Sequence, residues 1–159
     1  MAQKTEKLKW KFTGGANVRG LEGDLVFVAG ETLTAKQYYF VTPGSVVGEV
    51  KLSTGGSLPT PIGVLQNTPA TGENAIVRVF GVTQLVPGPN ASQLTYGVFI
   101  NSGSTGRAQY SGASGIILGR WLNAACSGSS GTNLMTNLAT GSAFINCAAF
   151  TSGSTNASA

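Results

Sequence analysis

Residues able to do acid–base or nucleophilic chemistry are scarce in this 159-residue chain, which has six carboxylates, two cysteines and no histidine. A serine or cysteine nucleophile activated by an imidazole is therefore excluded. Paired carboxylates could act together only if two of the six acids met in space. Glu22 and Asp24 are close in sequence, but they lie in the Gly-containing stretch 19–24, which we interpret as a solvated loop. We expect no catalytic residues and no enzymatic activity.

Cofactor and metal motifs are also missing from the sequence. It has no phosphate-binding glycine loop that ends in Lys-Ser or Lys-Thr, no dinucleotide fingerprint between a strand and a helix, and no calcium loop of alternating aspartates. Two thiols, Cys126 and Cys147, cannot complete a four-ligand zinc site without histidine. We predict that both are buried apolar thiols, with a disulfide formed after release from the cell as the alternative. We expect no cofactor, no metal and no small-molecule substrate.

The positive charge of the chain is concentrated at its N-terminus. The net charge is +4, and the first 13 residues alternate lysines with large apolar residues. The members of this pattern are Lys4, Lys7, Leu8, Lys9, Trp10, Lys11 and Phe12. In an extended segment, Leu8, Trp10 and Phe12 would share one face and the lysines the other. We predict a basic arm over residues 1–13, which is either an edge strand of its own domain or a segment that crosses a neighbouring chain.

The rest of the chain predicts one β domain. Charged residues make up 10% and hydrophobic residues 42% of the sequence, and the hydrophobic ones gather in short β-branched and aromatic runs separated by Gly and Pro. Strands are predicted at 38–41, 46–52, 62–65, 75–82, 96–100, 106–110, 116–122 and 143–150. Strands this short favour a single-domain antiparallel β-sandwich or β-barrel over residues 14–150. The best helix candidate is a single turn at 132–138, and residues 151–159 are predicted to be a flexible tail.

The order of the predicted strands occurs twice. Strands at 38–41, 46–52, 62–65 and 75–82 are followed by strands at 96–100, 106–110, 118–121 and 143–149. This repetition predicts an internal duplication, with two halves around a pseudo-twofold axis. Alternation across 75–82 places Val77 and Val79 on one face and Ile76, Arg78 and Phe80 on the other. Both faces are mostly apolar, so we expect one to be covered by another sheet or subunit.

One long segment resembles a known family. Residues 61–82, PIGVLQNTPATGENAIVRVFGV, are preceded by LTAKQYYFV at 33–41 and followed by Gly-Arg-Ala at 106–108 and Ile-Leu-Gly-Arg at 117–120. Over residues 31–122 the chain resembles the capsid decoration, or head cement, proteins of tailed bacteriophages. The resemblance implies a homotrimer that binds the major capsid protein on the outer surface of the virion, at threefold or quasi-threefold positions. It implies no catalysis.

On this view the arm would carry the capsid contact, through Lys4, Lys7, Lys9, Trp10, Lys11 and Phe12, with aromatic anchors and charge attraction combined. The chain lacks the apolar segment of a signal peptide or membrane span, so we expect synthesis in the host cytoplasm.

Two other functions stay open. A virion module that binds a glycan or the host surface would use Tyr96, Tyr110 and Trp121, if these aromatic side chains are exposed. Nucleic-acid binding through the basic arm would be weak and salt-sensitive, because the body adds no basic stripe.

Overall fold

The computed structural model describes residues 23–55, 59–89, 91–112, 116–123 and 140–147. Within these ranges the chain is all-β, as predicted, with one 3-10 turn at Ala91–Gln93. No helix in the described part of the chain is long and apolar enough to cross a membrane. The predicted arm 1–13, helical turn 132–138 and tail 151–159, and Cys126, lie outside the described residues. The strands are β1 (Gly23–Ala29), β2 (Phe40–Pro43), β3 (Glu49–Leu52), β4 (Gly63–Leu65), β5 (Asn74–Leu85), β6 (Phe99–Ser102), β7 (Ala108–Tyr110), β8 (Gly119–Trp121) and β9 (Gly141–Asn146).

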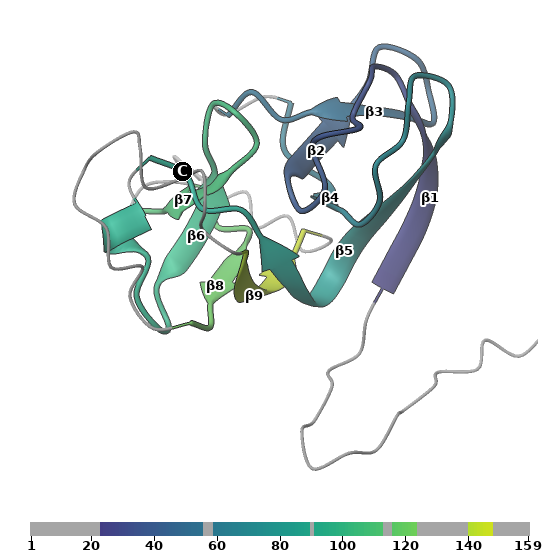
Figure 1. Ribbon diagram of the computed structural model, residues 1–159. Coiled ribbons are helices and arrows are strands. Elements are labelled where there is room, and N and C mark those ends of the chain that lie inside the picture. The colour runs from purple at the N-terminus through teal and green to yellow at the C-terminus, as the bar shows by residue number, and fades with distance from the viewer. Residues whose placement is uncertain (1–22, 56–58, 90, 113–115, 124–139, 148–159) are drawn as a thin grey trace, which may run out of the picture.

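The first five strands form a small closed barrel, which we call the first half. Its strands pair in the order β1-β3-β2-β4-β5, and β1 also pairs with β5, so the sheet has no free edge there. All of these pairs are antiparallel except β1 with β3. Its core is filled by side chains from each strand and from the connection between β1 and β2, namely Ala29, Leu33, Val41, Val50, Leu65, Ala75 and Val77. Figure 1 shows this half on the right of the molecule.

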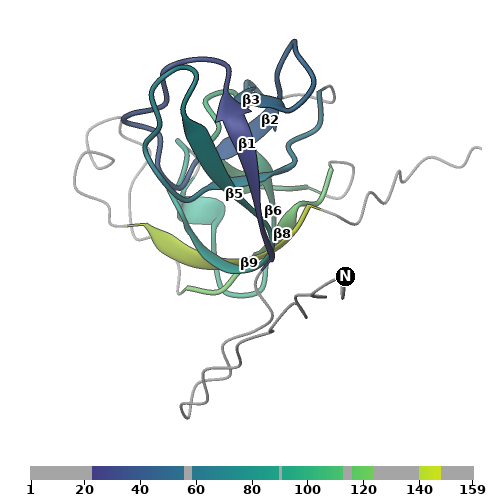
Figure 2. The same ribbon diagram turned by 90° about the vertical axis from the view of Figure 1, so that its right-hand side faces the viewer.

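The second half continues from the same long strand. Residues 74–80 of β5 pair with β1, while residues 80–85 pair with β9, and the sheet goes on through β8 and β6 to β7. Beyond β5, Pro87 makes a parallel bridge to Ala108 of β7. β5 is therefore the last strand of the first half and the first strand of the second, as Figures 1 and 2 show.

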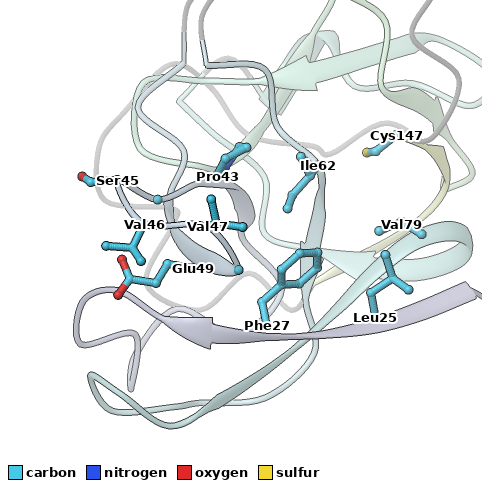
Figure 3. Close-up of a pocket in the computed structure, with 12 residues that line it drawn as sticks. Leu25, Phe27, Pro43, Ser45, Val46, Val47, Glu49, Ile62, Val79 and Cys147 are labelled. Carbon is cyan, nitrogen blue, oxygen red and sulfur yellow. The ribbon is translucent and has the colours of Figure 1, made fainter.

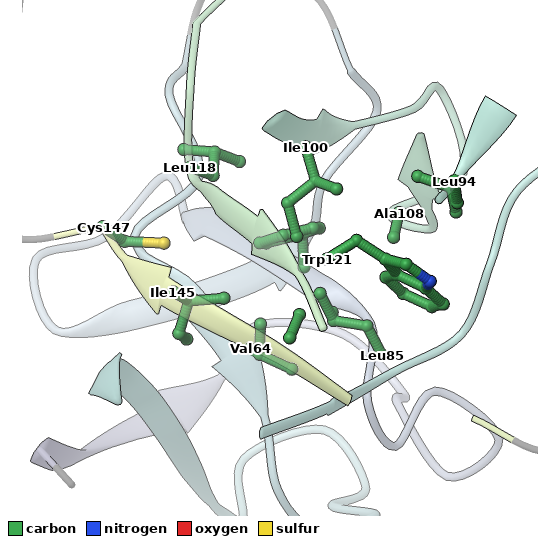
Figure 4. Packing of buried hydrophobic residues seen from close by; sticks show 11 residues of the cluster. Val64, Leu85, Leu94, Ile100, Ala108, Leu118, Trp121, Ile145 and Cys147 are labelled. Carbon is green, nitrogen blue, oxygen red and sulfur yellow. The ribbon is translucent and has the colours of Figure 1, made fainter. Parts of the chain in front are cut away.

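The core of the second half is built around Trp121. The fully buried indole belongs to one cluster with Leu85, Leu94, Ile100 and Ile145, which Figure 4 shows. Gly141 lies against the indole so closely that any side chain there would collide with the ring. Phe40 and Val64 of the first half belong to the same buried cluster. The two halves are thus joined by packing as well as by β5.

The strand pairing of the first half is repeated in the second, which confirms the predicted duplication of strand order. In the first half β2 pairs with β3 and β4, and β4 pairs with β5. In the second half β6 pairs with β7 and β8, and β8 pairs with β9. Backbone hydrogen bonds match as well: in the first half they run from Tyr39 N to Lys36 O, Tyr38 N to Leu65 O, Leu65 N to Tyr39 O and Ile62 N to Val41 O. Their counterparts in the second half run from Val98 N to Thr95 O, Gly97 N to Trp121 O, Trp121 N to Val98 O and Leu118 N to Ile100 O.

Two predictions about the first half are wrong. Asp24 does not lie in a solvated loop, because it is part of β1, and its Oδ1 accepts a 2.8 Å ion-pair hydrogen bond from Arg78 Nε on β5. Residues 46–48 were predicted as the start of a strand, but β3 begins at Glu49. Gly48 has a φ of +86°, a left-handed conformation that no extended strand adopts, so residues 44–48 form a turn before β3.

Candidate functional site: two exposed apolar surfaces

The large apolar side chains that stay exposed gather on both halves of the molecule. On the first half they are Leu25, Val26, Val28, Val46, Val47 and Ile76; on the second they are Tyr96, Phe99, Tyr110 and Ile117. Single exposed apolar side chains are ordinary, but groups of them mark contact surfaces on soluble proteins. These two groups are therefore the candidate surfaces for contact with another protein.

An apolar pocket of about 540 Å³ opens on the first half. Figure 3 shows side chains from β1, from the turn 44–48 and from β5 around a common space. The apolar ones are Leu25, Phe27, Val46, Val47, Ile62 and Val79, and Glu49 is the charged residue at the pocket. Such a mixture of apolar walls and one fixed charge suits a side chain that is largely apolar and carries a positive group.

The turn 44–48 forms one wall of the apolar pocket. Gly44 N donates to Glu49 O at 2.8 Å, and Glu49 N donates to Val46 O at 3.1 Å, so the turn is closed by its own backbone. Val46 and Val47 lie at its tip, and the Val47 side chain is fully exposed. The turn therefore holds two valines in water on a fixed backbone, at an energetic cost that contact with another apolar surface would remove.

On the second half, Tyr96, Phe99, Tyr110 and Arg120 form what we call the aromatic surface. The Arg120 guanidinium lies 4.3 Å from the centre of the Phe99 ring, and its Nη1 donates to Gly97 O at 3.2 Å. Gly97 has a φ of +85°, which shapes the turn that presents Tyr96, 74% exposed. Since no carboxylate side chain follows Glu73, the whole second half lacks an acid that could pair with Arg120. Aromatic and arginine side chains of this kind are the residues most enriched in protein interfaces.

Cys147 lies at the inner end of the apolar pocket and is buried. Burial desolvates the thiolate and raises the pKa of the Cys147 thiol from 9.0 to about 12, so the side chain is a neutral thiol at physiological pH. This agrees with the prediction of a buried apolar thiol, although a disulfide with Cys126 stays untested because Cys126 lies outside the described ranges. No cluster of three or more potential metal ligands occurs among the residues the structure describes.

The predicted site residues have different outcomes. Lys4, Lys7, Lys9, Trp10, Lys11 and Phe12 all lie outside the described residues. Trp121 does not meet the condition that the glycan-binding alternative sets, because its indole is fully buried in the core of the second half. Tyr96 and Tyr110 are exposed, as that alternative requires. The turn 44–48 was not predicted, although the Val-Val pair between Gly44 and Gly48 is a signal that could indicate an apolar turn.

Comparisons with known proteins define the fold but no family. No family model matches the chain, and no curated protein matches it in sequence. Among solved structures, the chain is similar to the N base of head fiber gp8.5 of bacteriophage phi29. The TM-score is 0.52 at 13% sequence identity, and the match covers 79% of this chain and 95% of the other. At this identity the likeness shows a shared fold.

Proposed function

We propose that the chain is a non-enzymatic structural protein of a phage head, a decoration protein that binds the outer surface of the major capsid lattice. The observation that supports this most is the fold shared with the base of a phage head fiber over almost the whole length of that structure. The resemblance of residues 31–122 to head cement proteins supports the same proposal independently. The exposed apolar surfaces supply what such a protein needs, which is area for protein contacts.

Decoration would stabilise the head by mass action. A protein that binds the assembled lattice, and not free capsid subunits, shifts the assembly equilibrium towards the shell in proportion to its occupancy. Copies that are linked to one another bind more tightly than single copies, because the second contact is intramolecular. A homotrimer is part of the proposal for this reason, and it matches the threefold or quasi-threefold positions that the resemblance implies.

The arm is the proposed capsid contact, with Lys4, Lys7, Lys9, Trp10, Lys11 and Phe12 as its binding residues. Deletion of residues 1–13 tests this: we expect loss of occupancy on mature heads, measured by cosedimentation and electron microscopy. Deletion of the uncharged residues 152–159 is the control and should leave occupancy unchanged. Full occupancy without residues 1–13 would reject the arm as the contact, and failure of the intact chain to bind heads would reject decoration itself.

Binding to a glycan or to the host surface is the alternative, and the exposed Tyr96 and Tyr110 favour it. Exposed tyrosines can stack on sugar rings, but the loss of Trp121 from this surface leaves a smaller platform. A glycan array probed with the intact chain and with Tyr96→Ala separates the two functions. Glycan binding that Tyr96→Ala abolishes, together with no binding to heads, would favour the alternative.

A further inference from the structure

A contact inside the chain gives the starting point. The turn 103–107 of the second half packs on the first half: Phe40 N donates to Gly106 O at 2.7 Å, and Gly106 lies against the Leu52 side chain. Phe40 and Val64 are completely buried here, in one cluster with Ala108 of the second half. The first half thus offers a surface of Phe40, Leu52 and Val64, and the second half covers it.

The repeat assigns a counterpart to every part of this contact. Phe40 pairs with Val64 as Phe99 pairs with Arg120, and Val41 pairs with Leu52 as Ile100 pairs with Tyr110. The counterparts of Phe40, Leu52 and Val64 are therefore Phe99, Tyr110 and Arg120. Phe40 is 0% exposed, whereas Phe99 is 39% and Tyr110 is 42% exposed. The same surface is thus covered on the first half and open on the second.

The covering element has an open counterpart too. Gly103 N donates to Arg107 O as Gly44 N donates to Glu49 O, so the turn 44–48 corresponds to the turn 103–107. One turn is packed against the other half of the chain, while the other holds Val46 and Val47 in solvent. Each half therefore exposes one of the two surfaces of this contact: the first half exposes the turn, and the second half exposes the aromatic surface.

The two unused surfaces carry opposite charges. Glu49 corresponds to Arg107, because each closes its turn through its backbone carbonyl. In the used contact, Arg107 Nε donates to Tyr39 Oη of the other half at 3.2 Å. In the unused contact, the turn is followed by the acid Glu49, and the aromatic surface carries Arg120. Opposite charges on two surfaces are the complementarity expected where they meet.

We propose that the turn 44–48 of one copy packs on the aromatic surface of a second copy, which repeats between chains the contact that the turn 103–107 makes within the chain. Val46 and Val47 then cover Phe99 and Tyr110, and Glu49 pairs with Arg120. The two surfaces differ, so the contact is head-to-tail and links each copy to the next, as in a closed ring. This contact would hold the proposed trimer together. Its role on a phage head rests on the proposed function, but self-association itself is measured without heads.

The first test replaces the exposed valines in the full-length chain. Val46→Asp/Val47→Asp places two charges where an apolar contact is expected, and sedimentation equilibrium should show at least a tenfold loss of association. Val26→Asp is the control, because Val26 is also exposed but belongs neither to the turn 44–48 nor to the lining of the apolar pocket. It should associate as the wild type does. Unchanged association of the double variant, or a wild-type chain that stays monomeric at every concentration measured, would overturn the inference.

The second test exchanges the charges. Glu49→Arg and Arg120→Glu should each weaken association about tenfold or more, because like charges then face each other, and the double variant should recover most of it. A double variant as weak as the single ones would overturn the pairing, provided that its thermal unfolding matches the wild type. Loss of association on deletion of residues 1–13, with no effect of Val46→Asp/Val47→Asp, would assign the contact to the arm instead. Head binding measured in parallel separates this result from failure of the proposed function.

Discussion

The two halves of the molecule share one strand order and one pattern of hydrogen bonds, yet they differ in which surfaces they leave exposed. The first half exposes a turn with two valines, and the part of it that corresponds to the aromatic surface is buried. The second half exposes the aromatic surface, and its turn is packed against the first half. This difference between the two copies of one strand order is the basis of the proposed contact between chains.

The cores differ as well. The first core is made of aliphatic side chains, whereas the second contains the large indole of Trp121. Gly141 makes room for this indole. The second half therefore depends on one side chain more than the first half does, and substitutions can measure this asymmetry.

The largest effect should come from Trp121→Ala. Removal of a buried indole leaves a cavity and should cost about 3–5 kcal/mol of the free energy of unfolding. Its counterpart in the first half is Leu65, which is also fully buried, and Leu65→Ala should cost about 2–5 kcal/mol. Urea unfolding followed by circular dichroism compares the two. A smaller loss for Trp121→Ala than for Leu65→Ala would show that the second core does not depend on the indole in the way proposed.

Two glycines at corresponding positions should have similar, smaller effects. Gly63 in β4 lies against the backbone of Arg78, and Gly119 in β8 lies against the backbone of Phe144. A methyl group at either position would force neighbouring strands apart, so Gly63→Ala and Gly119→Ala should each cost about 1–3 kcal/mol.

Gly112→Ala is the matched control for both glycines, because a side chain at Gly112 would meet no atom within 4 Å. Its free energy of unfolding should change by less than about 0.5 kcal/mol. If only one of the two buried glycines tolerates alanine, the halves have diverged at this position despite their common register.

The sequence predicted most strands and their repetition, because Gly and Pro punctuate short apolar runs in both halves. It missed β1, since Leu25, Val26, Phe27 and Val28 form an unbroken apolar run that follows the acids and glycines of the stretch 19–24 and shows no alternation. The contact surfaces were missed for a different reason. Whether Val46 or Trp121 is exposed depends on which distant segment covers it, and pattern alone carries no information on packing across some fifty residues of sequence.

The ion pair between Asp24 and Arg78 joins β1 to β5, and its contribution to the free energy of unfolding should be small. Arg78 also donates through Nη1 to Val82 O, so it keeps a partner when the acid is removed. The Asp24 side chain is 38% exposed, so solvent screens the pair. Asp24→Asn should therefore lower the free energy of unfolding by about 0–1 kcal/mol. A loss above about 2 kcal/mol at low salt would show that β1 is held by this pair rather than by its backbone ladder and its apolar side chains.

The smallest effect at neutral pH concerns Cys147, whose pKa burial raises from 9.0 to about 12. In the unfolded chain this thiol loses its proton near pH 9, whereas in the folded chain it stays protonated to about pH 12. The folded state therefore binds more protons in this window, and its stability must fall as the pH rises from 9 towards 12. Cys147→Ala keeps a small apolar side chain but removes this titration. The wild type should consequently lose more stability between pH 8 and pH 10.5 than the variant does, as measured by urea midpoints in reducing buffer. Parallel curves would mean that Cys147 is ionised in the folded chain, and hence that water reaches the inner end of the apolar pocket.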